Sequence, residues 1–380
     1  MPGRKRVLII LGFMHPDILK GFARKSREAG WILNIFSVLH GTVPGDWRAD
    51  GMLTTNVFRP DLRRFVRGTA RRLPTVLYGS NDLGVPVVHL ESDERTIGRL
   101  AAEHLLELGH RHFASFRYSR NRHALSRVSG FAGRLAEAGC ECISLEKLSR
   151  DGQGAGGWLR ERLKRLPRPL GLYTEDDMLA MRAIEAAGVA GWRVPGDLAV
   201  IGTGNLPLVC EQSEVPITSV AVPFEEEAYR AACLLEDLLR GRKLARRPLA
   251  PVAPIGVIPR ESTNAVASRH SVVRRALAWM TEQQREPDLS AAQVARACGV
   301  SVRLLYKVFE TDLSSSPMAE LLGLRLRSAR PLLRLGEEKI STIAEVCGFA
   351  NLRTFQRAFL RWHGCSATAW RAKQCERMSE

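Results

Sequence analysis

The sequence lacks a hydrophobic segment long enough to cross a membrane, which needs about 20 consecutive apolar residues. The apolar run nearest the N-terminus, Val7–Met14, spans only eight residues. His15-Pro16-Asp17 follows it, in place of the small residues that precede a signal-peptide cleavage site. We interpret the run as a buried first β-strand and expect a cytoplasmic protein.

The eight cysteines contain no C-x-x-C pair, a typical spacing of zinc ligands. Cys140 and Cys142 lie on opposite faces if their segment is a strand, which argues against a shared metal ion. Cys298 and Cys347 each precede a glycine, where a small buried side chain packs. We interpret all eight as reduced cytosolic thiols and expect neither a metal nor a cofactor.

Sequence motifs of several enzyme classes are also missing. The chain contains neither the phosphate-binding motif G-x-x-x-x-G-K-[ST] nor the nucleophile motif G-x-S-x-G. Asp176 and Asp177 form a carboxylate pair, but adjacent residues of a helix point in different directions. We therefore expect no catalytic activity. The alternatives are an enzyme acting on a sugar or nucleotide, and a solute-binding protein.

The chain carries a strong excess of positive charge. Its 56 Lys and Arg residues outnumber 40 Asp and Glu residues, which gives a net charge of +16 and a pI near 10. Residues 264–380 hold 18 basic against 11 acidic residues, and residues 1–263 hold 38 against 29. The excess is therefore only somewhat denser toward the C-terminus. Such a charge favours a polyanionic partner, with nucleic acid the first candidate.

One short pattern occurs twice in the C-terminal part. Ala295-Arg-Ala-Cys-Gly299-Val300 recurs 49 residues later as Ala344-Glu-Val-Cys-Gly348-Phe349. Two apolar residues four apart follow each copy, as on one face of a helix. A glycine between two short helical patterns is typical of a helix-turn-helix, because the sharp turn needs a residue that tolerates positive φ. We predict two such motifs, at residues 290–309 and 341–360.

Each predicted motif also has a helix-start signal. Ser290 and Gln293 match the spacing of a capping box, and Thr342 and Glu345 match it in the second copy. We therefore predict the same reciprocal capping at both starts.

The second helix of a helix-turn-helix enters the major groove of DNA, where its early residues read base edges. Arg and Lys suit guanine and Asn and Gln suit adenine, although each can instead hold a phosphate. The candidate DNA-binding residues are therefore Arg303, Tyr306 and Lys307 in the first motif, and Asn351, Arg353, Thr354, Gln356 and Arg357 in the second.

A helical pattern with leucines joins the two motifs over residues 317–335 and begins at Pro317. Such a helix would be ~28 Å long, which approaches the ~34 Å between successive major grooves on one face of the duplex. One chain could then grip two adjacent turns of DNA. Pro331 lacks a backbone donor, and we expect it to kink this helix or end it early.

Residues 1–262 alternate short β-branched runs with longer helical patterns, and the alternation restarts near residue 112. This pattern predicts two α/β lobes with parallel sheets and a ligand in the cleft between them, at the carboxyl ends of strands. The predicted strands are 7–11, 32–38, 51–55, 75–78, 85–89, 112–118, 142–145, 170–174 and 198–203. The predicted helices are 17–29, 95–108, 124–138, 157–166 and 177–187.

The character of the sequence changes in the polar segment that follows Pro259. Beyond it only helical patterns occur. We predict a ligand-sensing two-lobed domain at 1–262, a linker at 263–271 and an all-α DNA-binding domain at 272–380. The linker is short, so we expect the parts that it joins to touch.

The C-terminal pattern resembles the AraC/XylS-type DNA-binding domain over Leu289–Arg371. The matching residues are Ala295…Gly299, Pro317…Leu333, Ile343…Phe349, Phe355…Phe359 and Gly364…Arg371. Trp370 departs from the tyrosine that the family usually carries, and Cys365-Ser-Ala replaces a small-polar-Pro triplet. The resemblance implies a sequence-specific DNA-binding protein.

The two-lobed part resembles the periplasmic-binding-protein-like effector domain of LacI-type regulators. The matching residues include Asp93, Ser126-Arg127…Gly130-Phe131, Asp176-Asp177, Val194-Pro195 and Asn205. The resemblance implies that Arg127, Asp177 and Asn205 hydrogen-bond the hydroxyl groups of a ligand. Gly204 stands where many relatives have an acidic residue.

Together the two resemblances imply a transcription regulator, of the activator kind, whose effector is a sugar such as xylose. They also imply double-stranded DNA as its partner, a homodimer as its assembly and RNA polymerase as a further partner.

Overall fold

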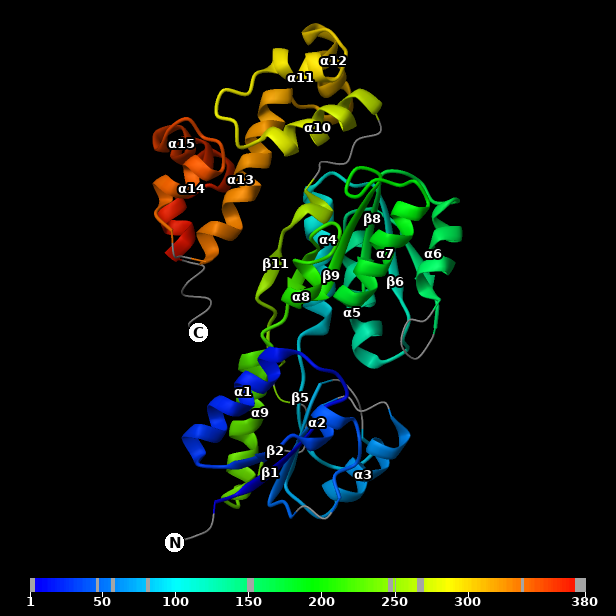
Figure 1. Ribbon diagram of the computed structural model, residues 1–380, viewed down its shortest axis with the longest axis vertical. Coiled ribbons are helices and arrows are strands. Elements are labelled where there is room, and N and C mark those ends of the chain that lie inside the picture. Colours follow the sequence, from blue (N-terminus) through cyan, green and yellow to red (C-terminus); the bar gives the residue numbers. More distant parts are fainter. Residues whose placement is uncertain are drawn as a thin grey trace. The chain divides into compact units, whose positions relative to one another are not determined.

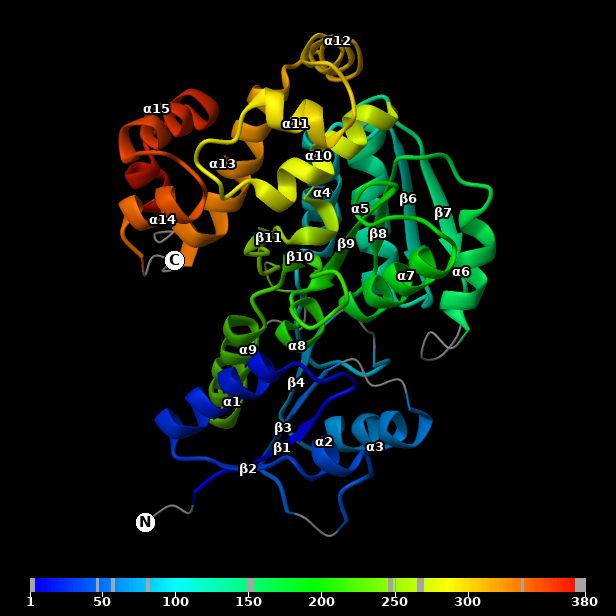
Figure 2. The ribbon, with the colours of Figure 1, turned by 45° about the horizontal axis from the view of Figure 1, so that its top comes forward.

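The structure is a computed structural model, shown in Figures 1 and 2. It describes residues 4–45, 48–55, 59–79, 83–148, 154–244, 249, 251–264, 270–335 and 338–372. The chain divides into two compact units, each considered by itself. Unit 1 comprises the described residues of 1–98, 119–130 and 221–256, and unit 2 those of 99–118, 131–220 and 257–380.

Unit 1 is built on a five-stranded parallel sheet in the order β2-β1-β3-β4-β5. Its strands are β1 Arg6–Ile10, β2 Ile32–Asn34, β3 Gly51–Thr54, β4 Thr75–Tyr78 and β5 Val88–Leu90. Helices α1 and α9 cover one face of this sheet, and α2 and α3 the other (Figures 1 and 2). Their bounds are α1 Pro16–Ala29, α2 Phe36–His40, α3 Pro60–Ala70 and α9 Phe224–Leu239. Strands covered on both faces are buried, as β3 and β4 are throughout.

Helices α1 and α9 pack closely because α1 has a glycine at the contact. A Cβ built on Gly21 would lie 2.2 Å from the carbonyl oxygen of Glu225 and 2.8 Å from the Cβ of Ala228. Any side chain at Gly21 would therefore push the two helices apart.

A second sheet has six strands in the order β11-β10-β9-β8-β6-β7. They are β6 His112–Arg117, β7 Cys142–Glu146, β8 Leu170–Thr174, β9 Leu198–Gly204, β10 Thr218–Ala221 and β11 Gly256–Ile258. Strand β6 pairs in parallel with β7 and β8, and β8 with β9. The helices between strands are α4 Glu94–Glu107, α5 Arg122–Glu137, α6 Ala155–Leu163, α7 Asp177–Val189 and α8 Pro207–Cys210.

These two sheets confirm the predicted pair of α/β lobes, with some differences in the elements. The strand predicted at 32–38 ends at Asn34, because the Asn34 side chain accepts a hydrogen bond from the Phe36 backbone (2.8 Å) and α2 begins there. The sequence pattern predicts neither the short strands β10 and β11 nor helices α3 and α9. Strands of three or four residues carry too little periodicity to be recognised.

The described residues from 270 onward form helices and loops, as predicted. The helices are α10 Ser271–Gln283, α11 Ala291–Ala297, α12 Val302–Leu313, α13 Pro317–Leu335, α14 Ile340–Val346 and α15 Leu352–His363. Figure 2 shows α13 running from the α10–α12 group to the α14–α15 pair.

Helix α13 contributes to two separate hydrophobic cores. Its first half places Leu321 and Leu324 in a core with α10, α11 and α12. Its second half places Leu326, Ala329 and Leu333 in a core with α14 and α15. The linker helix is therefore a structural part of both motifs.

Pro331 does not end this helix early, although an early end was one of the two outcomes that we expected from it. Helix α13 continues through Pro331 to Leu335, the predicted last residue. Proline costs about 3 kcal/mol relative to alanine in a helix interior. The buried leucines on both sides of Pro331 offset this cost.

The first part of the polar segment after Pro259 is packed rather than free. Glu261–Thr263 form a short 3-10 helix with Ser262 and Thr263 buried. The Ser262 hydroxyl donates to the Val200 carbonyl (2.6 Å) and accepts from the Thr218 backbone (2.8 Å), so the segment is fixed to the second sheet. Residues 265–269 of the predicted linker lie outside the described residues.

No helix in the described ranges is both long enough and apolar enough to span a bilayer. The same part of the chain contains no group of three or more His, Cys, Asp or Glu residues suited to a metal ion. The seven cysteines that the structure describes are free thiols, and Cys375 lies outside the described residues.

Candidate DNA interface and ligand residues

Both predicted helix-turn-helix motifs are present, with helices α11 and α12 in the first and α14 and α15 in the second. The two turn glycines have the positive φ that the sequence predicts, +65° at Gly299 and +80° at Gly348. Apolar residues four apart, Leu305 and Phe309 or Phe355 and Phe359, are fully buried beneath each second helix.

The two turns differ in what surrounds them. A Cβ on Gly299 would meet nothing within 4 Å, whereas one on Gly348 would lie 2.1 Å from the Gln284 carbonyl oxygen. Gly348 therefore packs directly against the backbone that follows α10. Its lack of a side chain is needed for this close approach as well as for the turn.

The same backbone also receives a buried arginine from α13. Arg325 donates from Nε to the Gln284 carbonyl (2.8 Å) and from Nη2 to the Glu286 carbonyl (2.5 Å). Burial lowers the pKa of its guanidinium group. The Ser328 hydroxyl adds a bond to the Gln284 side chain (3.0 Å). Residues 284–286 are thus held both by α13 and by the turn of the second motif.

The predicted helix caps are right for the first motif and wrong for the second. Ser290 accepts from the Gln293 backbone (3.4 Å) and the Gln293 side chain accepts from the Ser290 backbone (2.8 Å), which completes a capping box. Helix α14 instead begins at Ile340, after Lys339, and has no side-chain cap. Thr342 therefore lies inside the helix, where it cannot act as an N-cap.

All eight candidate DNA-binding residues lie on, or immediately before, the second helices and are exposed. In α12 these are Arg303, Tyr306 and Lys307, and in or before α15 they are Asn351, Arg353, Thr354, Gln356 and Arg357. Asn351 caps α15, since its Oδ1 accepts from the Thr354 backbone (2.9 Å) and hydroxyl (3.0 Å). The Asn351 side-chain NH₂ group can still donate to an acceptor on a base or phosphate.

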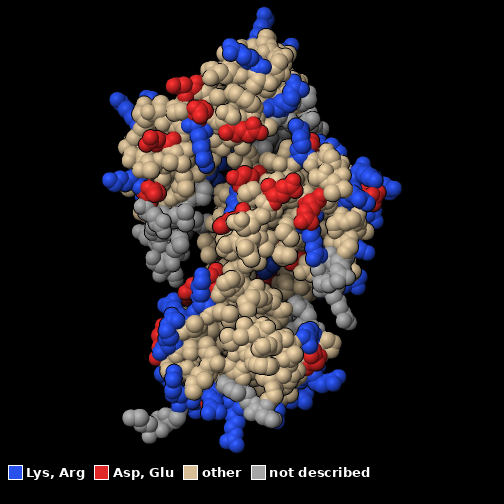
Figure 3. Space-filling model, viewed as in Figure 1, with Lys and Arg blue, Asp and Glu red and all other residues tan. Residues whose placement is uncertain are grey.

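The second helices of the two motifs, α12 and α15, differ in charge. Helix α15 contains three arginines and no acidic residue, whereas α12 contains two basic and two acidic residues. On the face shown in Figure 3 basic and acidic side chains are interspersed rather than gathered in one patch. The second motif therefore offers the stronger local attraction to a polyanion.

The ligand candidates Asp177 and Asn205 are brought together in unit 2. Asp177, 3% exposed, accepts hydrogen bonds from the Ser219 hydroxyl (2.6 Å) and the Leu206 backbone (2.8 Å). Ser219 also accepts from the Asn205 backbone (3.0 Å), so one hydroxyl links both residues. Burial raises the pKa of Asp177. The cluster lies at the carboxyl end of β9, where ligands of such folds bind.

Asn205 adopts a left-handed backbone conformation (φ 57°), which asparagine tolerates better than most residues. Its side-chain oxygen accepts from Nη2 of Arg260 (2.8 Å), and Nη1 of Arg260 donates to the Ile217 carbonyl (2.8 Å). Its position is therefore compatible with a role in a turn as well as with the predicted contact to a ligand.

Arg127 lies in unit 1, whereas Asp177 and Asn205 lie in unit 2. It forms an ion pair of 2.5 Å with Glu94 at the start of α4, and both side chains are about nine-tenths buried. Helices α4 and α5 approach closely here, because Gly130 packs against the Arg95 carbonyl. Nearby, Tyr78 donates to Glu227 (2.6 Å), and burial raises the pKa of Glu227 to about 7.

A small cavity opens at the carboxyl end of β1 in the same unit. Its volume is about 240 Å³, and Phe13, Met14 and Arg59 are among its lining residues. His15 is not among the lining residues: its ring is buried, lies tilted against Phe224 (4.5 Å between centroids) and caps α1. The aromatic and apolar lining suits the body of a small molecule.

The structure also shows partners for which the sequence pattern gave no signal. Glu94 pairs with Arg127, Ser219 holds Asp177, and Arg260 holds Asn205. Each partner lies far along the chain from the residue it contacts. No local pattern could have identified them.

Known families and proteins match both halves of the chain. Residues 102–263 match a periplasmic binding protein-like domain, and residues 294–373 match a helix-turn-helix domain. The xylose operon regulatory protein of Escherichia coli strain K12 is 28% identical over 300 residues, which cover 77% of this chain and 76% of that protein.

Solved structures agree with this organisation. The structure of the xylose-binding transcription activator XylR aligns with a TM-score of 0.67 at 23% identity, over 98% of each chain. The transcriptional regulator CelR, in complex with cellobiose, aligns with a TM-score of 0.56 at 25% identity, over 69% of this chain and 86% of that one. The chain is therefore a DNA-binding transcription regulator that joins a periplasmic binding protein-like ligand domain to an AraC-type helix-turn-helix domain.

Proposed function

We propose that this regulator responds to a sugar, such as xylose, bound by its two-lobed domain, and that the sugar controls binding to a specific DNA sequence. The observation that carries the proposal is the pair of exposed polar sets on α12 and α15, two helices that both pack on the linker helix α13. The relatives named for xylose and cellobiose support a sugar as the effector class.

Arg127, Asp177 and Asn205 are our candidates for contacts to sugar hydroxyls. Carboxylate, guanidinium and amide groups can form the paired hydrogen bonds that a polyol offers. Ligand binding would act by shifting a population of conformers, and only to the extent that the sugar binds one conformer better.

The proposal also covers the location of the protein, its oligomeric state and its partners. We assign the protein a cytoplasmic, non-enzymatic role as an activator that binds duplex DNA as a homodimer and contacts RNA polymerase. The similarity to transcription regulators supports this assignment. Two copies would present four reading helices to the DNA.

DNA recognition is tested by selecting from a pool of random duplexes with the full chain. We expect enrichment of one sequence class, and binding whose logarithm falls steeply and linearly with the logarithm of salt concentration. Enrichment of no sequence, or salt-insensitive binding, would contradict the proposal. Adding candidate sugars to the selected complex then tests control by the effector.

The ligand assignment is tested with Asp177→Asn, which keeps the shape of the side chain but removes its charge. A thermal-shift screen of monosaccharides and cellobiose first identifies the sugar that stabilises the wild-type chain. We expect Asp177→Asn to lose that response while selected DNA still binds. Asp176→Asn is the matched control, because Asp176 caps α7 and asparagine caps about as well. An unchanged sugar titration in Asp177→Asn would remove Asp177 from the site.

A further inference from the structure

Unit 2 contains a cavity of about 590 Å³ that the proposed function leaves unexplained. Its lining comes from α4, from the segments that follow β11 and α10, and from helices α13, α14 and α15. A volume of this size is within the range of small-molecule sites, about 300–1,000 Å³. Neither the DNA-reading residues nor the candidate sugar residues line it, so its chemistry is not explained by the proposed function.

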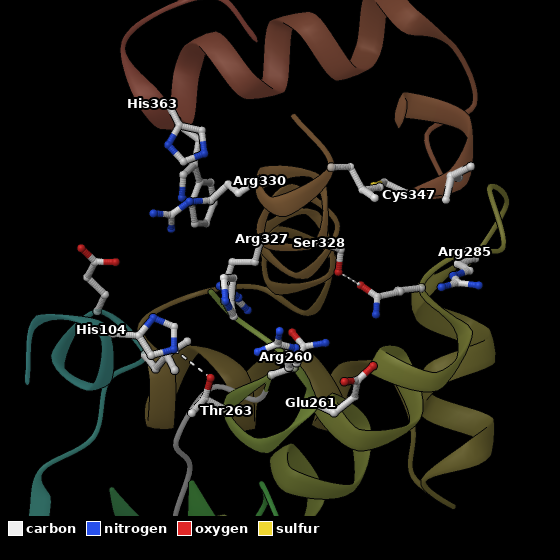
Figure 4. A pocket seen from close by; sticks show the side chains of 18 residues that line it. His104, Arg260, Glu261, Thr263, Arg285, Arg327, Ser328, Arg330, Cys347 and His363 are labelled. Carbon is white, nitrogen blue, oxygen red and sulfur yellow. Dashed lines mark hydrogen bonds between the residues drawn. The ribbon is translucent and has the colours of Figure 1, made fainter. Parts of the chain in front are cut away.

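The lining is strongly cationic. Four guanidinium groups face two carboxylates, those of Glu107 and Glu261. Figure 4 shows the Arg327 side chain reaching from α13 toward His104 and Arg260, and Arg330 lying beside His363. Arg260 already donates to Ile217 and Asn205, and this fixes its guanidinium group within unit 2.

Two side chains of the lining have buried nitrogen atoms without a hydrogen-bond partner in the described part of the chain. Nε and Nη2 of Arg327, and Nε2 of His363, have no hydrogen-bond partner among the described residues. A buried guanidinium that lacks a counter-ion is costly, and native proteins rarely leave one unpaired. Glu320 is the acidic group that acts on Arg327, from further back along α13.

The electrostatics of the cluster agree with a missing anion. Burial lowers the pKa of Arg327, and so does the positive charge of Arg330. Burial, followed by the charges of Arg330 and Arg327, lowers the pKa of His104 to about 3. Burial, followed by the charge of Arg330, also lowers the pKa of His363. The positive charges of Arg327 and Arg330 repel each other, and an anion bound between them would relieve that repulsion.

We infer that this cavity binds a small molecule carrying a phosphate group, held by Arg327 and Arg330 with His104 and His363 beside them. Arginine forks match the oxygens of a phosphate, and several cations together suit a dianion. The amides of Asn264 and Gln284 and the hydroxyl of Ser328 line the rest of the cavity and can bind the polar body of an ester. The site therefore takes a phosphate ester, separate from any sugar in the two-lobed domain.

Because α4 and α13 both line the cavity, such a ligand would bridge residues of the ligand-domain part of unit 2 and the linker helix. It would favour the arrangement in which the arginines of α13 lie beside α4. The binding of the anion does not depend on the proposed response to sugars.

The test uses the full chain and glycerol 3-phosphate, a phosphate ester without a sugar ring. Calorimetry and thermal shift compare it with inorganic phosphate, with glycerol, and with potassium chloride at equal ionic strength. We expect saturable binding of the ester, weaker saturable binding of inorganic phosphate, and no response to glycerol or chloride. No saturable response to either phosphate compound would overturn the inference.

Arg327→Met is the decisive variant, because it removes the unpaired charge but keeps an apolar stem. We expect a loss of affinity for the ester of about tenfold or more, with a melting temperature in anion-free buffer equal to or above that of the wild type. Arg330→Gln should also weaken binding. Arg160→Gln, an exposed arginine of α6, is the matched control and should bind the ester normally.

Two results with these variants would contradict the site. One is unchanged ester affinity in both Arg327→Met and Arg330→Gln. The other is weaker binding of duplex DNA by Arg327→Met together with no effect of phosphate compounds on the wild type, which would make Arg327 a contact to the DNA backbone.

Discussion

The two helix-turn-helix motifs have the same plan but different attachments. The turn of the first, at Gly299, is exposed, and a methyl group at its Cα would meet no other part of the chain within 4 Å. The turn of the second, at Gly348, is buried against the backbone of Gln284 and Arg285. The first helix of the first motif, in contrast, is capped by a complete capping box at Ser290.

The difference lies in how each motif is attached to the rest of the DNA-binding part. The backbone at 284–286 receives Arg325 from α13 and the turn of the second motif, so α10, α13 and α14 meet there. The first motif needs no such attachment, since it shares a core directly with α10. The recurring glycine therefore performs one task in the first motif and two in the second.

The largest effect that distinguishes the two motifs is expected from replacing their turn glycines. In Gly299→Ala the alanine must adopt an unfavourable left-handed backbone conformation, which lowers the free energy of unfolding by ~1–2 kcal/mol. Gly348→Ala adds a clash with backbone, which costs a further ~1–3 kcal/mol. Urea unfolding of the full chain measures the loss, and hydrogen exchange should locate it in α13–α15 for Gly348→Ala. Equal losses in the two variants would mean that the buried attachment does not matter.

The next effect concerns whether both motifs read bases. Arg353→Ala in the second motif should relax sequence preference at one base position by ~1–3 kcal/mol. Arg303→Ala in the first should do the same at a position about one helical turn, or about 10 base pairs, away. Repeating the random-duplex selection with each variant gives both positions. A uniform loss of affinity on all sequences would instead make the arginine a phosphate contact.

The local features of these motifs could be predicted from sequence because they depend on neighbouring residues. The positive φ at Gly299 and Gly348, the buried pairs four apart and the exposed set on α15 all follow from spacing. The bounds of α13 followed from its leucines. Pro331 does not end the helix early, because the packing of residues on both sides of it outweighs its local cost.

Features that depend on distant residues could not be predicted in this way. The packing of Gly348 on Gln284, and the hydrogen bonds of Asp177 to Ser219 and of Asn205 to Arg260, join segments far apart in sequence. The cationic cavity likewise gathers side chains from several separate helices. A single sequence contains the residues of such sites but not their proximity.

The smallest expected effect tests the contrast in helix caps. Ser290→Ala removes the capping-box hydroxyl of α11 and should lower the free energy of unfolding by ~1 kcal/mol. Thr342→Ala should change it very little, because Thr342 lies inside α14 rather than at its N-cap. Lys339→Ser, which supplies a capping hydroxyl where none exists, should instead raise stability by a few tenths to ~1 kcal/mol. Urea unfolding of the three variants side by side measures these values. A loss from Thr342→Ala as large as that from Ser290→Ala would show that the second motif is capped like the first after all.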